Sequence, residues 1–494
     1  MIPVPGFEGR RVAVFGLGRS GITAARALQA GGAIPVLWDD GVSGRMQAEA
    51  EGFIVEDLTR ADWSRFAALV LSPGAPLTHP KPHWTVERAH AAGVPVIGDV
   101  ELFARALDAL PRDQRPRVVA ITGTNGKSTT TALIGWVLKS AGLSVHIGGN
   151  IGIGVLALPA PTPDAVYVIE VSSYQLDLTT SFAPDVAILT NISPDHLDRH
   201  GGMEGYVAAK ARLFQAQGAE ALALVGVDEA WGEGIASDLR AQGRPICTVS
   251  TLSVIPGADT QRSEPGTQTA AYVAEAWVPG SATPPRNDGI EAAPGLLTAN
   301  GQPVADLSAA RSLPGRHNAQ NAAFAYAAAR ALGVSHDAAV EGLLTFPGLA
   351  HRMEAVGRLG PIRFINDSKG TNADAARQAL ASYPSVFWIA GGKAKEGGIE
   401  ALRDLFPHIA KAYLIGEAAD AFAETLGDTP HVVAHAMERA VEMAAADAAK
   451  AGGEQVVLLS PACASFDQFP DFEVRGEAFR AAVLALGAKP ELAA

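Results

Sequence analysis

The chain has 494 residues, and at this length about two to four domains are expected instead of a single core. Hydrophobic residues make up 48% of it and charged residues 18%, which is typical of a globular protein, and no apolar run approaches the roughly 18 residues of a membrane span. The formal net charge of −13 argues against nucleic acid as a partner, because nucleic acid favours basic protein surfaces.

Two further features indicate where the protein works. The N-terminal stretch MIPVPGFEGRRVAVFG lacks the charged-then-apolar pattern of a secretory signal. The two cysteines, Cys247 and Cys463, are far apart in the chain, so no disulfide framework is expected and a reducing compartment is favoured. We therefore expect a cytoplasmic protein without membrane insertion.

The first hundred residues follow the pattern of a dinucleotide-binding βαβ unit. A strand at 11–16 runs into the glycine-rich turn Gly16–Gly21, and an alanine-rich helix follows. The next strand, Ile34–Trp38, ends in Asp39, about twenty residues after the glycines, where an acidic residue would meet a ribose hydroxyl. Taken alone, this pattern predicts NAD binding; alternatively, the glycines only allow close packing of helix on strand. Two further strands are expected at Ala68–Leu71 and Val94–Ile97, which makes one doubly wound domain.

A phosphate-binding loop is predicted within Arg117–Val137. The apolar strand Val118–Ile121 breaks at a glycine-rich loop, 123–129, and an amphipathic helix follows. In such a strand–loop–helix unit, backbone N–H groups and the positive helix end hold a phosphate, and Lys127 adds a point charge. The hydroxyl of Ser128 or Thr129 can bind Mg²⁺. The usual spacing has a glycine where Ile121 stands, and the alternative reading is an ordinary strand-to-helix turn.

Two later strands of this unit end in polar side chains. Ala165–Val171 carries Glu170 near its end, and Val186–Thr190 runs into Asp195 and His196. Because ligands meet the carboxyl ends of parallel strands, these side chains are expected to face the phosphate-binding loop as Mg²⁺ or Mn²⁺ ligands. Alternatively, Asp195 caps a helix and His196 is a satisfied loop histidine.

The rest of the chain is less specific. On spacing alone, Lys210 is a snorkelling lysine on an apolar helix face. The range 256–295 is loop-like around a possible strand at 271–278, and we expect much of it to be a mobile insertion without chemistry. Asn300-Gly301 predicts a hairpin, and a helix from Arg316 would put Asn318 and Asn321 on one face. A third α/β run is expected from residue 349, with strands at Ile362–Ile365, Val386–Ala390, Ala412–Ile415 and Val456–Leu459, each of which ends in a polar loop.

Several short motifs run through the chain in a set order: TGTNGKST (122–129), GGNIG (148–152), EVSSYQL (170–176), NISPDHLDRH (191–200), AAKARLF (208–214), GRHNAQNA (315–322), HRME (351–354), INDSKGTN (365–372) and SPACASFDQF (460–469). Each is weak alone. Together they resemble the Mur ligase family, and SPACASFDQF is most similar to its D-glutamate-adding branch. The range 256–295 lies outside the family pattern.

The resemblance implies an α/β protein of three domains. Residues 1–107 would form a Rossmann-like domain that holds the UDP-sugar and not NAD, residues 108–348 a central P-loop ATPase-type domain, and residues 349–494 a C-terminal Rossmann-like ligase domain. The UDP-sugar residues implied are Gly18, Arg19, Ser20, Asp39, Ser72, Pro73, Gly74, Asn150 and Ser172. Arg19, Asp40 and Gly41 depart from the family pattern there.

The resemblance also assigns the ATP, metal and D-glutamate residues. ATP would meet Gly123, Thr124, Asn125, Gly126, Lys127, Ser128, Thr129, Asn318, Asn321, Arg352, Asp367 and Lys369. Two Mg²⁺ ions, or Mn²⁺, would be held by Ser128, Glu170, His196 and a Lys210 carbamylated by CO₂. D-glutamate would meet Thr371, Lys395, Ser465 and Phe472, with Phe466 where the family has leucine. Lys127, His196, Lys210 and Arg352 would be the catalytic residues.

The implied reaction is ATP-dependent formation of an amide bond in peptidoglycan precursor synthesis. UDP-N-acetylmuramoyl-L-alanine, D-glutamate and ATP would be the substrates, and the enzyme is expected to be a monomer. A folylpolyglutamate synthase-like ligase shares the P-loop but lacks a UDP-binding unit ahead of it. A further alternative is an NAD(P)-dependent dehydrogenase or nucleotide-binding module. That alternative does not explain why the P-loop and the 460–469 loop occur in one chain.

Overall fold

The computed structural model describes every residue except 252–288, 300–301, 311, 395–396 and 491–494. The chain is a mixed α/β protein that divides into two compact units. The first unit comprises residues Met1–Asp306 and Gln320–Leu343, and the second Leu307–Ala319 and Leu344–Ala494. Within the described ranges, no helix has both the length and the apolar character needed to cross a membrane.

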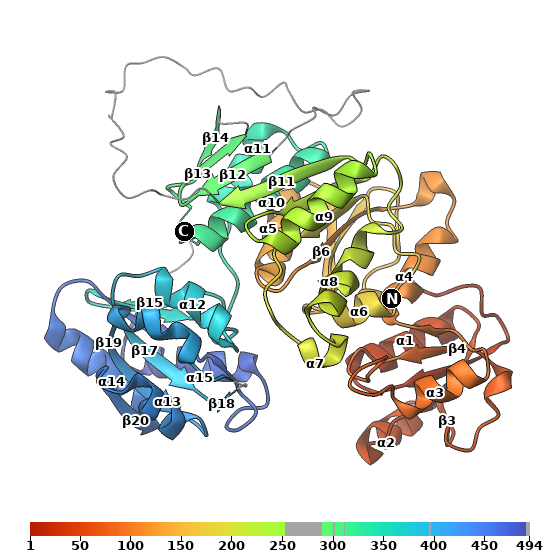
Figure 1. The fold of residues 1–494 in the computed structure, drawn as a ribbon, viewed down its shortest axis with the longest axis horizontal. Coiled ribbons are helices and arrows are strands. Elements are labelled where there is room, and N and C mark those ends of the chain that lie inside the picture. Colours follow the sequence, from red (N-terminus) through yellow and green to blue (C-terminus); the bar gives the residue numbers. More distant parts are fainter. Residues whose placement is uncertain (252–288, 300–301, 311, 395–396, 491–494) are drawn as a thin grey trace. The chain divides into compact units, whose positions relative to one another are not determined.

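The first sheet of the first unit is parallel and has the strand order β3-β2-β1-β4-β5. Figure 1 labels β3 and β4 of this sheet, together with helices α1, α2 and α3 of the same region. Val12 and Val14 of β1 are fully buried, as expected of a strand that is covered on both faces. The strands are β1 (Arg11–Phe15), β2 (Ile34–Trp38), β3 (Ile54–Val55), β4 (Phe66–Leu71) and β5 (Val96–Ile97), and the helices are α1 (Arg19–Ala30), α2 (Val42–Ala50), α3 (Trp84–Ala91) and α4 (Asp99–Asp108).

The second sheet of the first unit has nine strands in the order β14-β13-β12-β11-β10-β9-β6-β8-β7. It is parallel from β7 to β12 and ends in an antiparallel hairpin. Its strands are β6 (Arg117–Thr122), β7 (Ser144–Gly149), β8 (Ala165–Glu170), β9 (Val186–Leu189), β10 (Leu222–Gly226), β11 (Ile246–Thr251), β12 (Gly289–Ala293), β13 (Leu296–Ala299) and β14 (Gln302–Asp306). Its helices are α5 (Lys127–Ser140), α6 (Ser173–Asp177), α7 (Leu197–His200), α8 (Met203–Ala211), α9 (Ala230–Ala241), α10 (Arg316–Ala331) and α11 (His336–Leu344).

The second unit, taken by itself, is built on a seven-stranded sheet in the order β20-β19-β17-β21-β16-β15-β23. Its strands are β15 (Glu354–Leu359), β16 (Ile362–Asn366), β17 (Val386–Gly391), β19 (Ile409–Ile415), β20 (His431–His435), β21 (Gln455–Leu459) and β23 (Lys489–Pro490), and β18 (Lys393–Ala394) pairs separately with β22 (Cys463–Ala464). Its helices are α12 (Ala373–Ala381), α13 (Ala419–Leu426), α14 (Met437–Ala451) and α15 (Phe472–Ala485). Short 3₁₀ helices of the whole chain are Trp63–Arg65, Arg112–Gln114, Val155–Ala157, Arg212–Phe214 and Glu400–His408.

Most expected strands are present, with shifts of a few residues at their ends. The clearest difference falls in the range 256–295, much of which was expected to be a mobile insertion. Its last part, Gly289–Ala293, is instead strand β12 of the central sheet. The possible strand at 271–278 and the Asn300-Gly301 turn lie outside the described residues, although β13 and β14 pair as the predicted hairpin. The expected division at 107 and 348 into three domains stays a prediction.

The two sheets of the first unit share one hydrophobic core. A single cluster of buried side chains runs from Val12 and Phe103 to Tyr167 and Ala223. Helix α4 lies at the junction, where Gly98 donates a backbone hydrogen bond to Leu178 O at 3.0 Å. A Cβ atom on Gly98 would lie 2.9 Å from the side chain of Leu178, so only glycine fits without a shift.

Buried carboxylates hold α4 in this junction. Asp99 accepts hydrogen bonds from Gln175 Nε2 at 3.2 Å on each oxygen. Glu101, 1% exposed, accepts from the N–H groups of Thr180 at 2.8 Å and Ser181 at 2.9 Å. Burial opposes ionisation of Glu101, but these N–H groups together with the guanidinium of Arg105 outweigh it and lower the carboxyl pKa.

Replacing Glu101 by alanine should therefore destabilise the first unit by about 3 kcal/mol, because two buried N–H donors would lose a charged acceptor. Urea unfolding followed by circular dichroism measures this loss. The exposed Glu87→Ala in α3 is the matched control and should change stability by less than about 0.5 kcal/mol. Equal effects of the two substitutions would contradict the role of Glu101 in the junction.

Candidate active site

The predicted phosphate-binding loop leaves β6 between its two neighbours in the sheet, β9 and β8. Two glycines shape it: Gly123 has φ of +145° and Gly126, the N-cap of α5, has φ of +81°. A Cβ atom would lie 1.9 Å from Thr190 Oγ1 at Gly123 and 2.6 Å from Asn321 Oδ1 at Gly126. Both positions therefore require glycine, for conformation and for space.

The segment after β9 fixes this loop. Asn191 Oδ1 accepts a hydrogen bond from the N–H of Asn125 at 2.9 Å, and Thr190 Oγ1 donates to Asn125 O at 2.7 Å. Thr124 Oγ1 donates to Ser193 O at 3.1 Å and lies 3.0 Å from the hydroxyl of Tyr206. The loop is thus held in shape by side chains of the neighbouring strand end, as a preformed phosphate site requires.

Two lysines meet at one carbonyl oxygen of the loop. Lys127 Nζ donates to Gly123 O at 2.9 Å and to Thr124 O at 2.7 Å, and Lys210 Nζ donates to the same Gly123 O at 2.7 Å. Lys210 is 1% exposed, so the snorkelling interpretation is wrong. Burial first, and then the charge of Lys127, hold the pKa of Lys210 well below its ordinary value, against the opposing charges of Asp195 and Glu170.

Three of the predicted metal ligands, Ser128, Glu170 and His196, lie at or beyond the carboxyl ends of β6, β8 and β9, and the fourth, Lys210, lies on helix α8. Glu170, 2% exposed, accepts from Asn150 Nδ2 at 2.8 Å with one oxygen, while Oε2 is buried without a hydrogen-bond partner. His196 has a left-handed backbone, φ of +54°, and its Nε2 lies 3.3 Å from Asp195 Oδ2. His196 is the N-cap of α7 and Asp195 precedes it, and the capping role of Asp195 stays a prediction. Among the described residues, no group of three His, Cys, Asp or Glu side chains could hold a metal ion by itself.

Most of the predicted UDP-sugar residues lie at the carboxyl ends of β1, β2 and β4, whereas Asn150 and Ser172 follow β7 and β8 of the central sheet. Asp39 accepts from the N–H groups of Leu17 at 2.6 Å and Gly41 at 2.7 Å, so its carboxylate closes the glycine turn. A Cβ atom on Gly21 of α1 would lie 1.9 Å from Gly16 O, which supports the alternative that the glycines allow helix and strand to pack closely. A Cβ atom on Gly16 would lie 2.4 Å from the Cβ of Ser72, beyond the end of β4. Gly18 is the N-cap of α1, and Ser20 follows in its first turn.

Arg199 connects this edge to the central sheet. Its guanidinium donates to the carbonyls of Gly74 at 2.9 Å, Pro73 at 3.2 Å and Ala75 at 3.1 Å, and it lies 4.5 Å from the ring centroid of Tyr174. The loop that was predicted to bind the sugar nucleotide is therefore tied to the segment that carries His196. Arg199 belongs to the motif NISPDHLDRH, but the sequence predicted no role for it.

Three of the predicted binding residues also have structural tasks. Ser172 caps α6 with a capping box, in which its side chain accepts from Gln175 N at 3.3 Å. Helix α10 begins at Arg316 as expected, and Asn321 Oδ1 accepts from Thr130 Oγ1 at 3.1 Å beside the phosphate-binding loop. Asn318, assigned to the second unit, donates to Pro314 O at 2.9 Å.

In the second unit, the INDSKGTN segment leaves β16 next to β21. Asp367 is buried and accepts from Ser460 Oγ at 2.7 Å. Burial raises the pKa of Asp367 to about 7, although Ser460 and the charge of Arg352 oppose the shift. Lys369 Nζ lies 3.6 Å from the ring centroid of Phe472, so a residue predicted for ATP meets one predicted for D-glutamate.

The predicted D-glutamate loops lie side by side in the second unit. Strand β18 pairs with β22, which brings Lys393 opposite Ala464. Ser465 is buried, and its carbonyl accepts from the N–H of Phe469 at 2.8 Å. Phe466 is 71% exposed, Thr371 precedes the N-cap of α12, and Lys395 lies outside the described residues.

Sequence reasoning missed a buried arginine that joins these loops. Arg475, 1% exposed, donates to Ser368 O at 2.7 Å and to Cys463 O at 3.0 Å. His351, also unassigned, has φ of +62° and accepts on its carbonyl a hydrogen bond from Lys369 N at 3.0 Å. The residues that surround Arg475 and His351 in the sequence do not indicate these contacts. For Arg475 the pattern even suggests the opposite, because an arginine within an amphipathic helix usually faces water.

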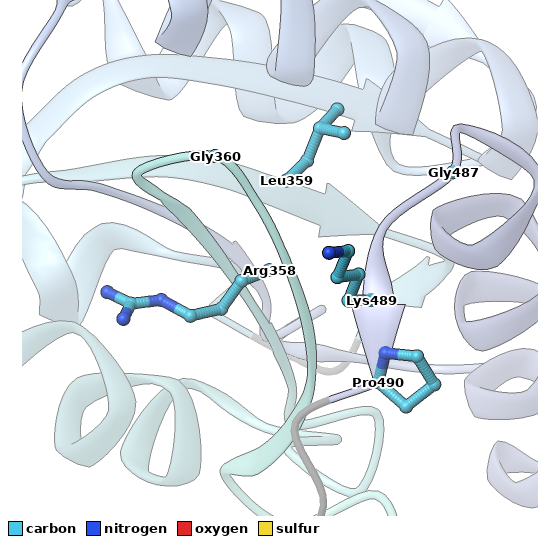
Figure 2. A pocket seen from close by; sticks show the side chains of 6 residues that line it. All are labelled: Arg358, Leu359, Gly360, Gly487, Lys489 and Pro490. Carbon is cyan, nitrogen blue, oxygen red and sulfur yellow. The ribbon is translucent and has the colours of Figure 1, made fainter.

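A separate pocket of about 460 Å³ lies where the β15–β16 turn meets β23. Figure 2 shows Arg358, Leu359, Gly360, Gly487, Lys489 and Pro490 around it. None of these was a predicted site residue, so this pocket is not the expected D-glutamate site.

The chain was compared with known proteins. A model described as "Mur ligase middle domain" matches residues 121–329, and one described as "Mur ligase, glutamate ligase domain" matches residues 351–463. The UDP-N-acetylmuramoylalanine–D-glutamate ligase of Caulobacter vibrioides (strain NA1000 / CB15N) is 60% identical over 493 residues, which cover 99% of this chain and 98% of that protein. The ligase of the same name from Mesorhizobium japonicum is 51% identical over 493 residues, 99% of each chain.

The fold has solved counterparts as well. The structure of UDP-N-acetylmuramate-alanine ligase from Thermotoga maritima matches with a TM-score of 0.56 at 16% identity, over 97% of this chain and 99% of that one. A pseudomurein peptide ligase type C from Methanothermus fervidus matches with a TM-score of 0.51 at 18% identity, over 97% of this chain and all of that one. At these identities the likeness concerns the fold alone.

The buried Asp367 should make the stability of the ligand-free protein fall as pH rises from about 4 to 7. In that window the folded state holds a proton that the unfolded state releases, since the folded pKa is about 7 and the unfolded value is near 3.8. Asp367→Asn should remove this slope and stabilise the protein at pH 8 relative to wild type, by at most about 4 kcal/mol. Urea unfolding at pH 5 and pH 8 measures the free energy of unfolding of the wild type and of Asp367→Asn. If the two proteins differed by the same amount at both pH values, the assignment would be contradicted.

Proposed function

The chain belongs to the Mur ligase family, and we propose from this membership that it is an ATP-dependent ligase that adds D-glutamate to UDP-N-acetylmuramoyl-L-alanine in peptidoglycan synthesis. The observation that carries the proposal is the identity of 60% over almost the whole chain to a ligase of that name. The preformed phosphate-binding loop of the first unit supports ATP as the energy source.

The chemistry explains why ATP is needed. A carboxylate does not react with an amine near pH 7, because an oxide is too poor a leaving group. The L-alanyl carboxylate attacks the γ-phosphorus of ATP, the bond to ADP breaks, and an acyl phosphate forms. The D-glutamate amine then attacks the acyl carbon and loses a proton, and inorganic phosphate leaves with the former carboxylate oxygen.

The protein contributes position and charge to these steps. The N–H groups of the loop and Lys127 would neutralise the transferred phosphoryl group, and Arg352 would add a second positive charge. Holding the reactants in line is worth roughly 7–11 kcal/mol per well-oriented step. Asn318, Asn321, Asp367 and Lys369 would bind the nucleotide, while Thr371, Lys395, Ser465 and Phe472 would hold D-glutamate.

The residues present fit a divalent cation. Glu170 Oε2 is buried without a hydrogen-bond partner, which costs free energy unless a cation or water satisfies it. Ser128 and His196 would complete the ligand set with Lys210 carbamate, for two Mg²⁺ ions or Mn²⁺. When bound, the metal would neutralise phosphate charge.

The UDP-sugar would lie at the edge that Gly18, Arg19, Ser20, Asp39 and Ser72–Gly74 form, with Asn150 and Ser172 nearer the reacting carboxylate. Because ATP and UDP-linked precursors are made in the cytoplasm, the enzyme would work there. The monomeric state stays a prediction.

Lys210 is proposed to be carbamylated. Its amine is fully buried and shares the carbonyl of Gly123 with Lys127, so two ammonium groups would repel each other at one acceptor. The neutral amine reacts with CO₂ to give Lys–NH–COO⁻ and a proton, and the product is an anion with two acceptor oxygens. Carbamylation thus replaces the Lys210 ammonium, which would repel a metal ion, by a carbamate that can bind one.

The function predicts phosphate release from ATP that requires both UDP-N-acetylmuramoyl-L-alanine and D-glutamate. L-glutamate, L-lysine and meso-diaminopimelate should give no release, and Lys127→Ala should abolish turnover, because the remaining donors do not replace its charge. A colorimetric phosphate assay against this panel measures it. Stimulation by L-lysine equal to that by D-glutamate would place the enzyme in another branch, and NAD binding without UDP-sugar binding would end the ligase proposal.

Carbamylation predicts a ¹³C carbamate resonance when the protein is equilibrated with ¹³C-bicarbonate. The signal should vanish in Lys210→Ala and persist in Lys139→Ala, an exposed lysine of α5 that serves as control. Lys210→Ala should be nearly inactive, and added acetate should restore part of the rate by supplying a carboxylate. A fully active Lys210→Ala without the resonance in either protein would refute the modification.

A further inference from the structure

A buried histidine of the first unit spans one turn of helix α6. His200 Nε2 lies 3.0 Å from Ser173 Oγ, and His200 Nδ1 lies 3.1 Å from Asp177 Oδ2. Ser173 and Asp177 are four residues apart, so they lie on the same face of α6, and the two ring nitrogens match their separation. Since a carboxylate accepts, Nδ1–H is the donor to Asp177, and Nε2 is left to pair with the Ser173 hydroxyl.

This order of serine, histidine and aspartate is also found in nucleophilic enzymes, but here it is inaccessible. Ser173 is 4% exposed, and the His200 side chain is 2% exposed. A nucleophile must reach its substrate, so Ser173 does not serve as one. The hydrogen bonds instead join two segments of the chain.

The two segments are those that carry the proposed metal ligands. Glu170 ends β8, two residues before Ser172, which caps α6. His196 is the N-cap of α7, and His200 is the last residue of that helix. The His200 side chain therefore clamps the segment of Glu170 to the segment of His196.

Aromatic contacts extend the clamp to the His196 ring. The Tyr174 ring lies 5.5 Å from that of His200 in a stacked arrangement, with 25° between the planes. The same ring lies 5.0 Å from that of His196, and its hydroxyl pKa is raised by burial to about 12. Gly205 fits against this turn closely, because a Cβ atom there would lie 1.9 Å from His200 O.

We propose that His200 is a positioning residue, which fixes His196 and Glu170 relative to each other through its hydrogen bonds to Ser173 and Asp177 and its contact with Tyr174. The inference rests on the proposed role of His196 and Glu170 as metal ligands. Residues that orient metal ligands from behind are worth about 10–100-fold in metal affinity.

The test is Mn²⁺ binding in the presence of ADP, measured as free Mn²⁺ by electron paramagnetic resonance. His200→Phe keeps a ring against Tyr174 and removes both hydrogen bonds, so Mn²⁺ should bind about tenfold more weakly. His200→Asn places an amide near the Nδ1 position and His200→Gln near the Nε2 position, and each should recover part of the affinity. His336→Phe is the matched control, since His336 also combines a hydrogen bond and a ring contact, both with Tyr326, and it should bind as wild type.

A second readout separates positioning from folding. The Mg²⁺ concentration for half-maximal phosphate release should rise about as much as the Mn²⁺ dissociation constant, with the rate recovered at saturating Mg²⁺. If His200→Phe fails to fold, Asp177→Asn removes one acceptor charge at the rim of the clamp and should show a smaller shift in the same direction.

The outcomes are distinct. A lower melting temperature with unchanged Mn²⁺ affinity in the folded variants would mean that the clamp only stabilises the fold, and would overturn the inference. Wild-type protein that binds no Mn²⁺ with ADP would refute the proposed metal site itself, and the inference with it. Weakened Mn²⁺ binding in His200→Phe and Asp177→Asn, with His336→Phe as wild type, supports the positioning role.

Discussion

At two positions of the loop between β6 and α5 there is no space for a side chain, and the site in the central sheet depends on this steric limit. A side chain at Gly123 or Gly126 would collide with Thr190 or Asn321, and these neighbours are themselves held by hydrogen bonds to this loop and to α5. The loop therefore has its shape before any ligand arrives. Because its donors do not have to reorganise around a phosphate, their charge is available at no further cost in ordering.

Both units place ionisable groups where desolvation opposes their usual charge. In the first unit, burial lowers the pKa of Lys210; in the second, burial raises the pKa of Asp367. The charged forms are costly away from water, and burial also raises the pKa of Asp99, which holds the junction of the two sheets. Lys210 and Asp367 differ from Asp99 in their place, since one meets the phosphate-binding loop and the other belongs to the INDSKGTN segment.

Local patterns predicted the parts of the fold that local forces decide. The strand Ile34–Trp38 agrees with β2 residue for residue, and the helix from Arg316 begins where its motif indicates. Strand β12 was not expected, because it is short, with Ile290 as its one large apolar residue, and it is held between β11 and β13 by pairing on both sides. The roles of Arg475 and His200 were beyond sequence reasoning for the same reason: Arg475 meets Ser368, 107 positions away, and His200 meets Ser173, 27 positions away. Burial of Lys210 likewise depends on long-range packing, and the family resemblance alone pointed to that lysine.

The shared core of the first unit limits how this protein can be divided. One apolar cluster passes from the first sheet into the second, and Asp99 and Glu101 find their hydrogen-bond partners across the junction. A fragment cut at residue 107 would expose apolar surface, and Asp99 and Glu101 would lose the hydrogen bonds that they accept from Gln175, Thr180 and Ser181. Residues 1–107 are therefore a poor unit for recombination between related proteins: an exchange that preserves folding has to carry helix α6 and the Thr180–Ser181 turn along with it.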